Sequence, residues 1–275
     1  MDTFDTGTEE LLCALDERVA TITLNRPEKR NALSDNLTPA LREILLVLES
    51  DPRVGCIVIT GAGKAFCAGG DISGMGDNRS ASDTPRPSLE EGIRTLQHKQ
   101  ESLTLRLYEL VKPTIAALPG PAAGAGLSIA LACDMRIMAD TAFITTAFAN
   151  IGLSGDYGSS WFLTRLVGPA VAKELFFSSR RVSAEECKTL GIANKVVGFT
   201  ELQTQTQAFA QQIANGPATA IRYMKENLNR AINGDLKTCL AMEADRMVRS
   251  TRTTDHKEAV HAFMEKRPPQ FDHST

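Results

Sequence analysis

The sequence predicts an α/β protein with a helical C-terminal region. Over the first 158 residues, short apolar segments with strand character alternate with helical segments, as in a sheet covered by helices. Beyond Gly158, short helical segments follow one another, and only the strand-like 194–197 interrupts them. A strand–turn–helix pattern also recurs around GAGKAFCAGGDI and LPGPAAGAGLSIALACD. This recurrence indicates a spiral of similar units.

The first elements follow from apolar spacing. Residues 11–24 carry apolar residues at alternate positions on both sides of an Asp-Glu-Arg turn, which predicts a β-hairpin. Ser34 precedes a helical apolar period and predicts a helix that ends near Glu49. Residues 54–60 predict a buried strand. The Ser-, Asp-, Gly- and Pro-rich residues 74–87 predict a mobile loop.

The next elements form a second strand–helix–strand unit. We expect a helix at 89–111, because Pro113 disfavours helical backbone at the residue before it. A strand at 114–118, a helix at 124–133 and a strand at 135–139 follow. The uncharged stretch 113–133 is long enough to cross a membrane, but three prolines and three glycines would break such a helix. The remaining predicted helices are 159–166, 169–178, 183–190, 201–215, 217–232, 235–249 and 255–265.

Composition excludes several classes of function. The 275 residues are 43% hydrophobic and 23% charged, with a net charge of −3, which is ordinary for a soluble protein and argues against a nucleic-acid partner. Six cysteines show no metal-ligand spacing, so we expect reduced thiols and no metal. The acidic residues 1–10 lack the features of a signal peptide, and we expect a cytoplasmic protein that does not bind a membrane.

Two glycine-rich turns, 68–71 and 123–126, each follow a predicted strand. Small residues let the main chain approach a ligand, and two backbone amides at such turns can hold negative charge on a carbonyl oxygen. Turns of this kind also occur in every α/β protein. Neither turn matches a phosphate-binding P-loop or a dinucleotide fingerprint, so hydride transfer with a bound cofactor is not predicted.

Five segments, taken in order, resemble the crotonase superfamily, the enoyl-CoA hydratase/isomerase family. They are NRPEKRNALS (25–34), GAGKAFCAGGDI (61–72), LPGPAAGAGLSIALACDMRI (118–137), IGLSGDYGSSWFLTRLVG (151–168) and AFMEKRPPQF (262–271). The resemblance implies a crotonase-like spiral of ββα units over 1–200 with an acyl-CoA site. It also implies a helical region over 201–275 that builds a homotrimer or a dimer of trimers, and no cofactor beyond the coenzyme A of the substrate.

The resemblance also assigns residues. The oxyanion-hole amides would be those of Gly70 and Ala125. The coenzyme A would lie against a loop and the first glycine turn, where basic side chains meet phosphates; these residues are Lys29, Arg30, Ala32, Ala68, Asp71 and Ile72. Phe263 and Lys266 share a helix face and would reach the coenzyme A of a neighbouring subunit. From the residues alone, Lys29 and Arg30 are equally well solvated loop charges, Phe263 a packed aromatic and Lys266 a surface lysine.

The resemblance breaks where hydratases of the family carry two water-activating glutamates. Ser128 and Phe148 occupy those positions, and neither can activate water near neutral pH. A carboxylate remains at Asp156, in a segment that resembles family members with an aspartate that handles the proton. Burial beside an acyl chain would raise its pKa and suit a general base. Alternatively, Asp156 caps the helix that begins near Ser159.

The predicted reaction is a 3-enoyl to 2-enoyl isomerisation of an enoyl-CoA, because one base is enough for it. Four residues would line the acyl pocket: Ser128, Phe148, Leu153 and Trp161. The aromatic pair makes that pocket apolar, although such residues are more often part of a core. The alternatives are a hydratase that uses non-standard residues and an acyl-CoA-binding homologue without chemistry.

Overall fold

The computed structural model describes residues 1–71 and 88–272 of the chain. The predicted loop at 74–87 and the predicted coenzyme A contact Ile72 lie outside the described residues. The described strands form two sheets. The larger has seven strands in the order β1 (Asp2–Phe4), β2 (Leu11–Asp16), β3 (Val19–Leu24), β4 (Cys56–Gly61), β5 (Thr114–Leu118), β7 (Met135–Ala139) and β10 (Lys195–Val197). The smaller has β6 (Ala122–Ala123), β8 (Phe143–Thr145) and β9 (Val182–Ser183).

The large sheet begins as the predicted hairpin and continues as a parallel sheet. β1, β2 and β3 pair antiparallel, and β3, β4, β5, β7 and β10 pair in parallel. β5 is buried at every position, and β4 at every position but one. Strands buried on both faces need helices on both sides, because a parallel sheet exposes its apolar faces otherwise. The predicted α/β class is therefore confirmed.

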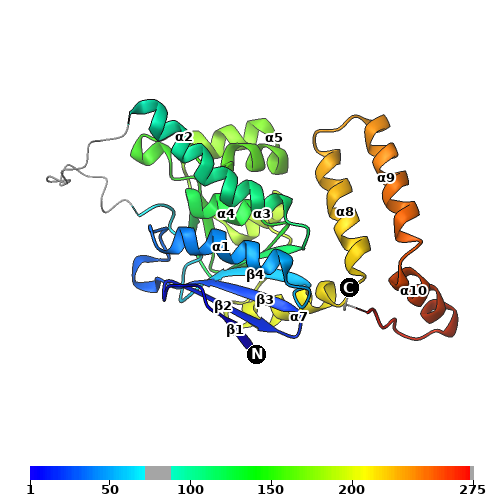
Figure 1. The fold of residues 1–275 in the computed structure, drawn as a ribbon. Helices are drawn as coiled ribbons and strands as arrows, with labels where there is room; N and C mark the ends of the chain where they lie inside the picture. The colour runs from blue at the N-terminus through cyan, green and yellow to red at the C-terminus, as the bar shows by residue number, and fades with distance from the viewer. Residues whose placement is uncertain (72–87, 273–275) are drawn as a thin grey trace.

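Three helices cover this sheet. α1 (Leu37–Ser50) and α4 (Ala125–Ala132) lie above it in Figure 1, and α7 (Leu202–Ala214) packs on β3, β4, β5 and β7 from below. The predicted start of α1 is confirmed, since Ser34 Oγ accepts a hydrogen bond of 3.0 Å from the Leu37 amide. α4 is buried along its whole length.

The remaining helices differ from the predictions in detail. The expected helix at 89–111 is interrupted by a π-helical turn, and the two expected helices at 159–166 and 169–178 run on with a kink at Gly168, where φ is 77°. β6, β8 and β9 were not predicted, because two or three residues carry no apolar period. The other helices are η1 (Pro27–Lys29), α2 (Leu89–Gln100), η3 (Glu101–Leu105), α3 (Arg106–Glu109), η4 (Ala149–Ile151), α5 (Ser159–Ser178), α6 (Ala184–Thr189), η5 (Phe199–Glu201), α8 (Ala218–Ala231), α9 (Leu236–Ser250) and α10 (Thr254–Glu265).

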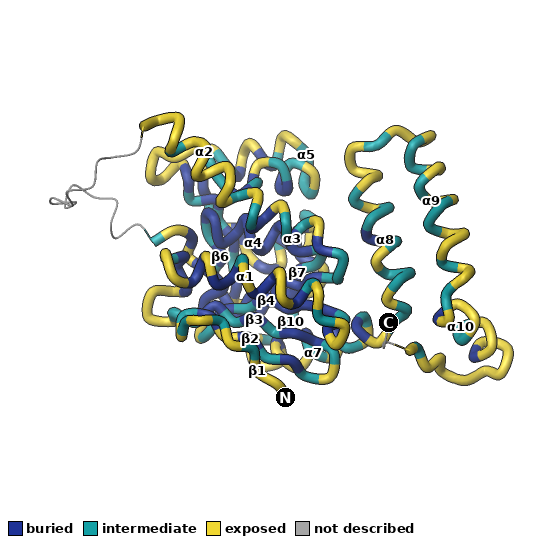
Figure 2. The backbone as a smooth tube through the Cα atoms, viewed as in Figure 1, coloured by how far each residue is buried: buried dark blue, intermediate teal, exposed yellow. Residues whose placement is uncertain are grey.

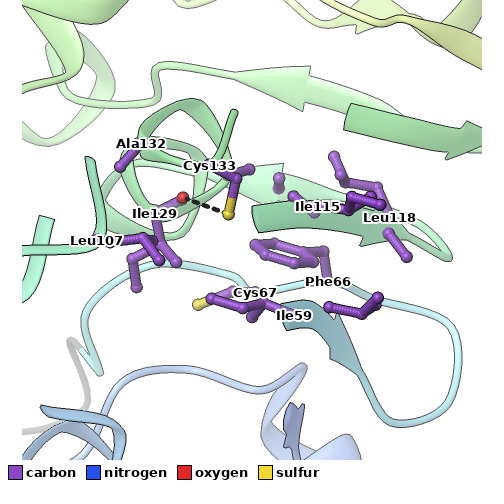
Figure 3. Close-up of a cluster of buried hydrophobic side chains, with 14 of the residues drawn as sticks. Ile59, Phe66, Cys67, Leu107, Ile115, Leu118, Ile129, Ala132 and Cys133 are labelled. Atoms are coloured by element: carbon purple, nitrogen blue, oxygen red, sulfur yellow. Dashed lines mark hydrogen bonds between the residues drawn. The ribbon is translucent and has the colours of Figure 1, made fainter. Parts of the chain in front are cut away.

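An apolar core lies between β4, β5, α3 and α4 (Figure 3). Phe66 and Cys67, on the chain that leaves β4, have no exposed surface and pack into this core. Cys133 Sγ contacts the Ile129 carbonyl oxygen at 3.5 Å, at the far end of α4. Burying a large apolar side chain contributes about 1.5–3 kcal/mol, so this cluster fixes the chain on both sides of the glycine-rich turns.

The C-terminal helices differ from the body. α8 runs beside the body, where Lys225 pairs with Asp134 at 2.8 Å, and α9 and α10 lie beyond α8 (Figures 1 and 2). α9 has none of its residues buried by the described chain. α7, at the start of the predicted 201–275 region, instead packs on the sheet, where Ala210 and Ala214 are buried. Among the helices that the structure describes, none has the length and apolar character needed to cross a membrane.

Candidate active site

The two glycine-rich turns lie side by side because their chains are hydrogen-bonded. The segment after β4 forms an isolated parallel bridge with β6, in which Cys67 faces Ala122. Ala123 N donates to Cys67 O at 3.0 Å, and Phe66 N donates to Pro121 O at 3.0 Å. The turn that carries Gly70 and the turn that carries Ala125 are thus tied together by backbone.

The glycines in these turns are required by close approach. A Cβ on Gly69, whose φ is 95°, would lie 2.9 Å from Ala123 O and 3.6 Å from Ala125 N. On Gly126 it would lie 2.4 Å from the carbonyl oxygen of Cys67. Gly124 precedes α4 with φ 51° and ψ −126°, a backbone conformation that glycine adopts without strain. Larger residues at these positions would therefore push the two turns apart.

The amides of Gly70 and Ala125 remain available for a ligand. Leu33 pairs with the residues on either side of Gly70: its amide donates to Gly69 O, and Asp71 N donates to its carbonyl. Ala125 begins α4, where a helix leaves its amides without intrahelical partners. Within residues 1–71 and 88–272, neither amide donates a hydrogen bond. The N-terminal end of α4 adds a field that favours negative charge there.

Both amides border one cavity of about 600 Å³. Ten of the residues predicted from the sequence line it: Lys29, Arg30, Ala32, Ala68, Gly70, Asp71, Ala125, Phe148, Leu153 and Asp156. Gly69 and Gly124 of the two predicted turns line it as well. Sequence reasoning missed part of the wall, namely Glu28, Thr146, Ala147, Asn150 and Ile151. Four of these follow β8, a strand too short to be recognised, so their place beside the turns had no signal in the sequence.

Asp156 presents its carboxylate to the cavity without a protein partner. Its Oδ1 is buried and accepts no hydrogen bond from the described residues. Burial raises the pKa of Asp156 to about 6, because the charged form loses solvation. The capping alternative is wrong: α5 begins after Gly158 with no side-chain cap, and it is the Asp156 carbonyl that accepts from Ser159 N at 3.2 Å. The carboxylate is thus not used by the helix.

Two predicted pocket residues do not line this cavity. Ser128 is fully buried in α4, and its hydroxyl lies 3.2 Å from Gly124 O and 3.0 Å from Asp156 O. The hydroxyl thus links the second glycine-rich turn to the backbone at Asp156. Trp161 is turned towards α8, where it packs edge-on against Tyr108 at 5.3 Å and borders a separate cavity. The guanidinium of Arg165 lies 3.8 Å from the centre of its ring. Both predictions are corrected: the Ser128 hydroxyl is used by two backbone carbonyls, and Trp161 packs against Tyr108.

The loop predicted to bind coenzyme A is anchored by one buried side chain and exposes its basic residues. Asn31 is fully buried, and its amide nitrogen donates to Ala62 O at 3.0 Å and to Ala65 O at 2.8 Å. Lys29 and Arg30 are exposed beside the cavity, and Arg30 adopts a left-handed φ of 51°. Asp71 also lines the cavity, but its carboxylate forms an ion pair of 3.3 Å with Arg26.

Phe263 and Lys266, the two coenzyme A contacts predicted near the C-terminus, are not among the residues that line this cavity. Phe263 is 86% exposed on α10, next to Met264, which is 77% exposed. Lys266 follows that helix in a left-handed conformation with φ 55°. Their predicted contact is with a neighbouring subunit, so it stays a prediction.

Known proteins resemble this chain over nearly its whole length. Residues 15–274 match the family model described as enoyl-CoA hydratase/isomerase. The chain belongs to the enoyl-CoA hydratase/isomerase family. It is 36% identical over 264 residues to a 1,2-epoxyphenylacetyl-CoA isomerase of Escherichia coli, covering 96% of this chain and 98% of that protein. It is 34% identical to a short-chain-enoyl-CoA hydratase of Clostridium acetobutylicum, covering 91% and 92%.

Solved structures show the same fold. An enoyl-CoA hydratase from Polaromonas superposes with a TM-score of 0.87 at 34% identity, over 95% of this chain and 99% of that one. The predicted crotonase fold is therefore confirmed, and so is the prediction of an acyl-CoA enzyme of the hydratase/isomerase type. Because relatives of similar identity are named isomerase and hydratase, family membership does not assign the reaction.

Proposed function

We propose that this member of the enoyl-CoA hydratase/isomerase family moves a double bond in an enoyl-CoA, from C3–C4 to C2–C3. The observation that carries the proposal is the Asp156 carboxylate in the cavity that Gly70 and Ala125 line, because one of its oxygens is buried and accepts no hydrogen bond from the described residues. Of the other two carboxylates that the described residues place on the cavity wall, Glu28 is exposed and Asp71 pairs with Arg26. The positions of the two glutamates that hydratases of the family use hold Ser128 and Phe148. A serine in a helix and a buried phenylalanine leave one base for the whole reaction.

The proposed reaction uses that base twice. The thioester oxygen lies between the two amides, and the Asp156 carboxylate takes a proton from C2. The electron pair spreads over the thioester oxygen and C4 as a dienolate, which the amides stabilise as charge develops. The Asp156 carboxyl then returns the proton to C4, which leaves the double bond at C2–C3. A pKa of about 6 keeps Asp156 ionised at neutral pH and close enough to neutrality to return the proton.

We propose that the exposed residues of the cavity wall bind the coenzyme A. Lys29 and Arg30 are exposed there, in reach of phosphate groups that pass the mouth. We further propose a homotrimer or a dimer of trimers, in which Phe263 and Lys266 reach a neighbour's coenzyme A. The exposed Phe263 and the unburied α9 support this, since large apolar side chains in water indicate an interface. The proposed chemistry needs no metal or redox cofactor, because base and oxyanion donors belong to the chain.

Hydration is the second candidate, and the relative named as a hydratase favours it. It requires a water positioned at C3, which the isomerisation does not. Isotopes separate the two: 2-enoyl and 3-enoyl thioesters are incubated with the enzyme in H₂¹⁸O and, separately, in D₂O, and the products are analysed by mass spectrometry. Isomerisation gives a moved double bond without ¹⁸O, and deuterium at C2 or C4 wherever the protonated Asp156 exchanges with solvent before it returns the proton. Products that carry ¹⁸O in proportion to turnover would refute the isomerase assignment.

A further inference from the structure

The aromatic side chain of Phe148 stands between the two parts of the site that carry the chemistry. Phe148 is 5% exposed and lines the cavity. A Cβ placed on Gly124, which precedes the Ala125 amide, would lie 3.6 Å from its ring, and one placed on Gly155, which precedes Asp156, would lie 3.7 Å from it. The Phe148 ring thus packs between Gly124 and Gly155, the glycines that precede Ala125 and Asp156.

A second ring holds Phe148 in this place. Phe176, from α5, stacks on it with ring centres 6.0 Å apart and planes inclined by 17°. A Cβ on Gly155 would lie 3.1 Å from Phe176, so the absence of a side chain at Gly155 makes room for the pair. Stacked aromatic pairs contribute about 0.5–1.5 kcal/mol beyond the area that they bury. Phe176 does not line the cavity, so only Phe148 faces a ligand.

Two kinds of contact therefore link the segment of Gly124 to the segment of Asp156: a polar contact through Ser128 and an apolar contact through Phe148. Ser128 Oγ lies within hydrogen-bonding distance of Gly124 O and Asp156 O from inside α4, and Phe148 fills the space on the cavity side. The buried Oδ1 of Asp156 has no hydrogen-bond donor among the described residues, which agrees with an apolar surrounding on that side. A water molecule needs two to four polar partners to remain in such a place.

We infer that Phe148 is a specificity-determining residue of the proposed isomerisation: its ring excludes water from the space between Asp156 and the bound enoyl group. The inference rests on the proposed function. With the ring in place, the Asp156 carboxylate meets only the substrate's C2 and C4. Without it, a water can bind there: Asp156 takes one of its protons as its oxygen bonds to C3 of the 2-enoyl thioester, and Asp156 then gives that proton to C2 of the resulting enolate. The ring therefore decides between a double-bond shift and the addition of water.

Two substitutions of similar reach separate this role from a purely structural one. Phe148→Met keeps an apolar side chain at the position, whereas Phe148→Gln offers a water both a donor and an acceptor. The purified enzymes are compared with a 3-enoyl-CoA and a 2-enoyl-CoA in H₂¹⁸O, and the ratio of ¹⁸O-labelled product to isomerised product is measured. Phe162→Leu, which removes a largely buried ring that packs on Tyr108 outside the cavity, controls for lost packing.

We expect Phe148→Gln to raise the ratio of labelled to isomerised product roughly tenfold over wild type, and Phe148→Met and Phe162→Leu to leave it near the wild-type value. If Phe148→Gln and Phe148→Met give the same ratio, Phe148 only supports the fold and the inference is wrong. A fall in rate with an unchanged ratio in Phe148→Gln has the same meaning. A wild-type enzyme that shifts no double bond would instead overturn the proposed function, so the two failures are distinguishable.

Discussion

The residues that line the cavity fall into a buried group and an exposed group, here called its inner and outer ends, which differ in charge. At the inner end, Ala125 and Phe148 are almost fully buried, and Asp156 has an oxygen without a partner. At the outer end, Lys29 and Arg30 are exposed on a loop. Charge–charge contacts are weak in water, and hydrogen bonds to developing charge are strong in a dry site. In the proposed function, the outer end therefore recognises the substrate and the inner end carries the chemistry. Substitutions at the inner end should lower kcat, and those at the outer end should raise KM.

The largest expected effect is that of Asp156→Asn, which removes the base and keeps the shape. Because general-base catalysis contributes about 10²–10⁴-fold, we expect kcat for the double-bond shift to fall within that range. Steady-state kinetics with a 3-enoyl-CoA and calorimetric titration with coenzyme A measure the two properties. Binding should remain within about twofold of wild type, since the amide has nearly the volume of the carboxylate. A variant with full turnover would remove Asp156 from the mechanism.

The next largest effect tests one amide. Ala125→Pro deletes the Ala125 N–H at the first position of α4, where proline is well tolerated in helices. Loss of one oxyanion-hole donor typically lowers kcat by about 10²–10³-fold, and we expect a fall of that size in stopped-assay kinetics. Thr254→Pro is the matched control, because Thr254 is the exposed first residue of α10. Equal activity of the two variants would speak against the Ala125 amide.

A smaller effect is expected at the outer end. Lys29→Ala and Arg30→Ala should each raise KM about two- to fivefold and leave kcat unchanged, because exposed charge pairs contribute about 0.2–1 kcal/mol. The increase should shrink in high salt, which screens exposed charges. Lys173→Ala, an exposed lysine of α5 away from the cavity, should leave KM unchanged at every salt concentration. A loss of kcat in the loop variants would contradict the division between the two ends.

The smallest effect concerns stability. The pKa of Asp156 is raised in the folded protein, so the folded state binds the proton more tightly than the unfolded chain does. Asp156 therefore costs stability once it ionises, and the cost grows as the pH rises through the window between about 4 and 6. We expect Asp156→Asn to be more stable than wild type by roughly 1–2 kcal/mol at pH 7, a value reduced for partial solvent access of the carboxylate. Urea unfolding at pH 7 and at pH 4 measures it; an equal gain at both pH values would contradict this origin.

Both ends of the cavity were predicted in part. Gly70, Ala125 and Asp156 follow or precede glycines in segments with strong local signals, and the structure brings all three to one cavity. Trp161 was placed in the pocket by proximity in sequence, yet helix α5 turns it towards Tyr108 and α8. Around the predicted Phe148, four cavity residues were missed, because the position of this stretch depends on β8, whose partner strands lie elsewhere in the sequence. They are Thr146, Ala147, Asn150 and Ile151.

The fold was likewise predicted where strands carry a clear apolar pattern and missed where strands are very short. The strands β2, β3, β4, β5 and β7 have five or six residues and a clear apolar pattern, and all were predicted. β6 and β9 have two residues each and pair with β8, and β6 also bridges to Cys67. Local periodicity therefore identifies the layers, whereas the cross-connections that shape the cavity arise from contacts between distant segments. In the exposed helices α9 and α10, apolar residues such as Met247 and Phe263 have no packing partner that the described chain would let the sequence predict.

The central claim is that two main-chain amides stabilise an enolate formed by Asp156. Hydrogen exchange at C2 of a saturated acyl-CoA in D₂O tests it most directly, because such a thioester can neither shift a double bond nor add water. By nuclear magnetic resonance, the wild-type enzyme should exchange C2 hydrogens, and Ala125→Pro should slow the exchange by about the same factor, 10²–10³, as the double-bond shift. Exchange in Ala125→Pro at the wild-type rate would contradict the account.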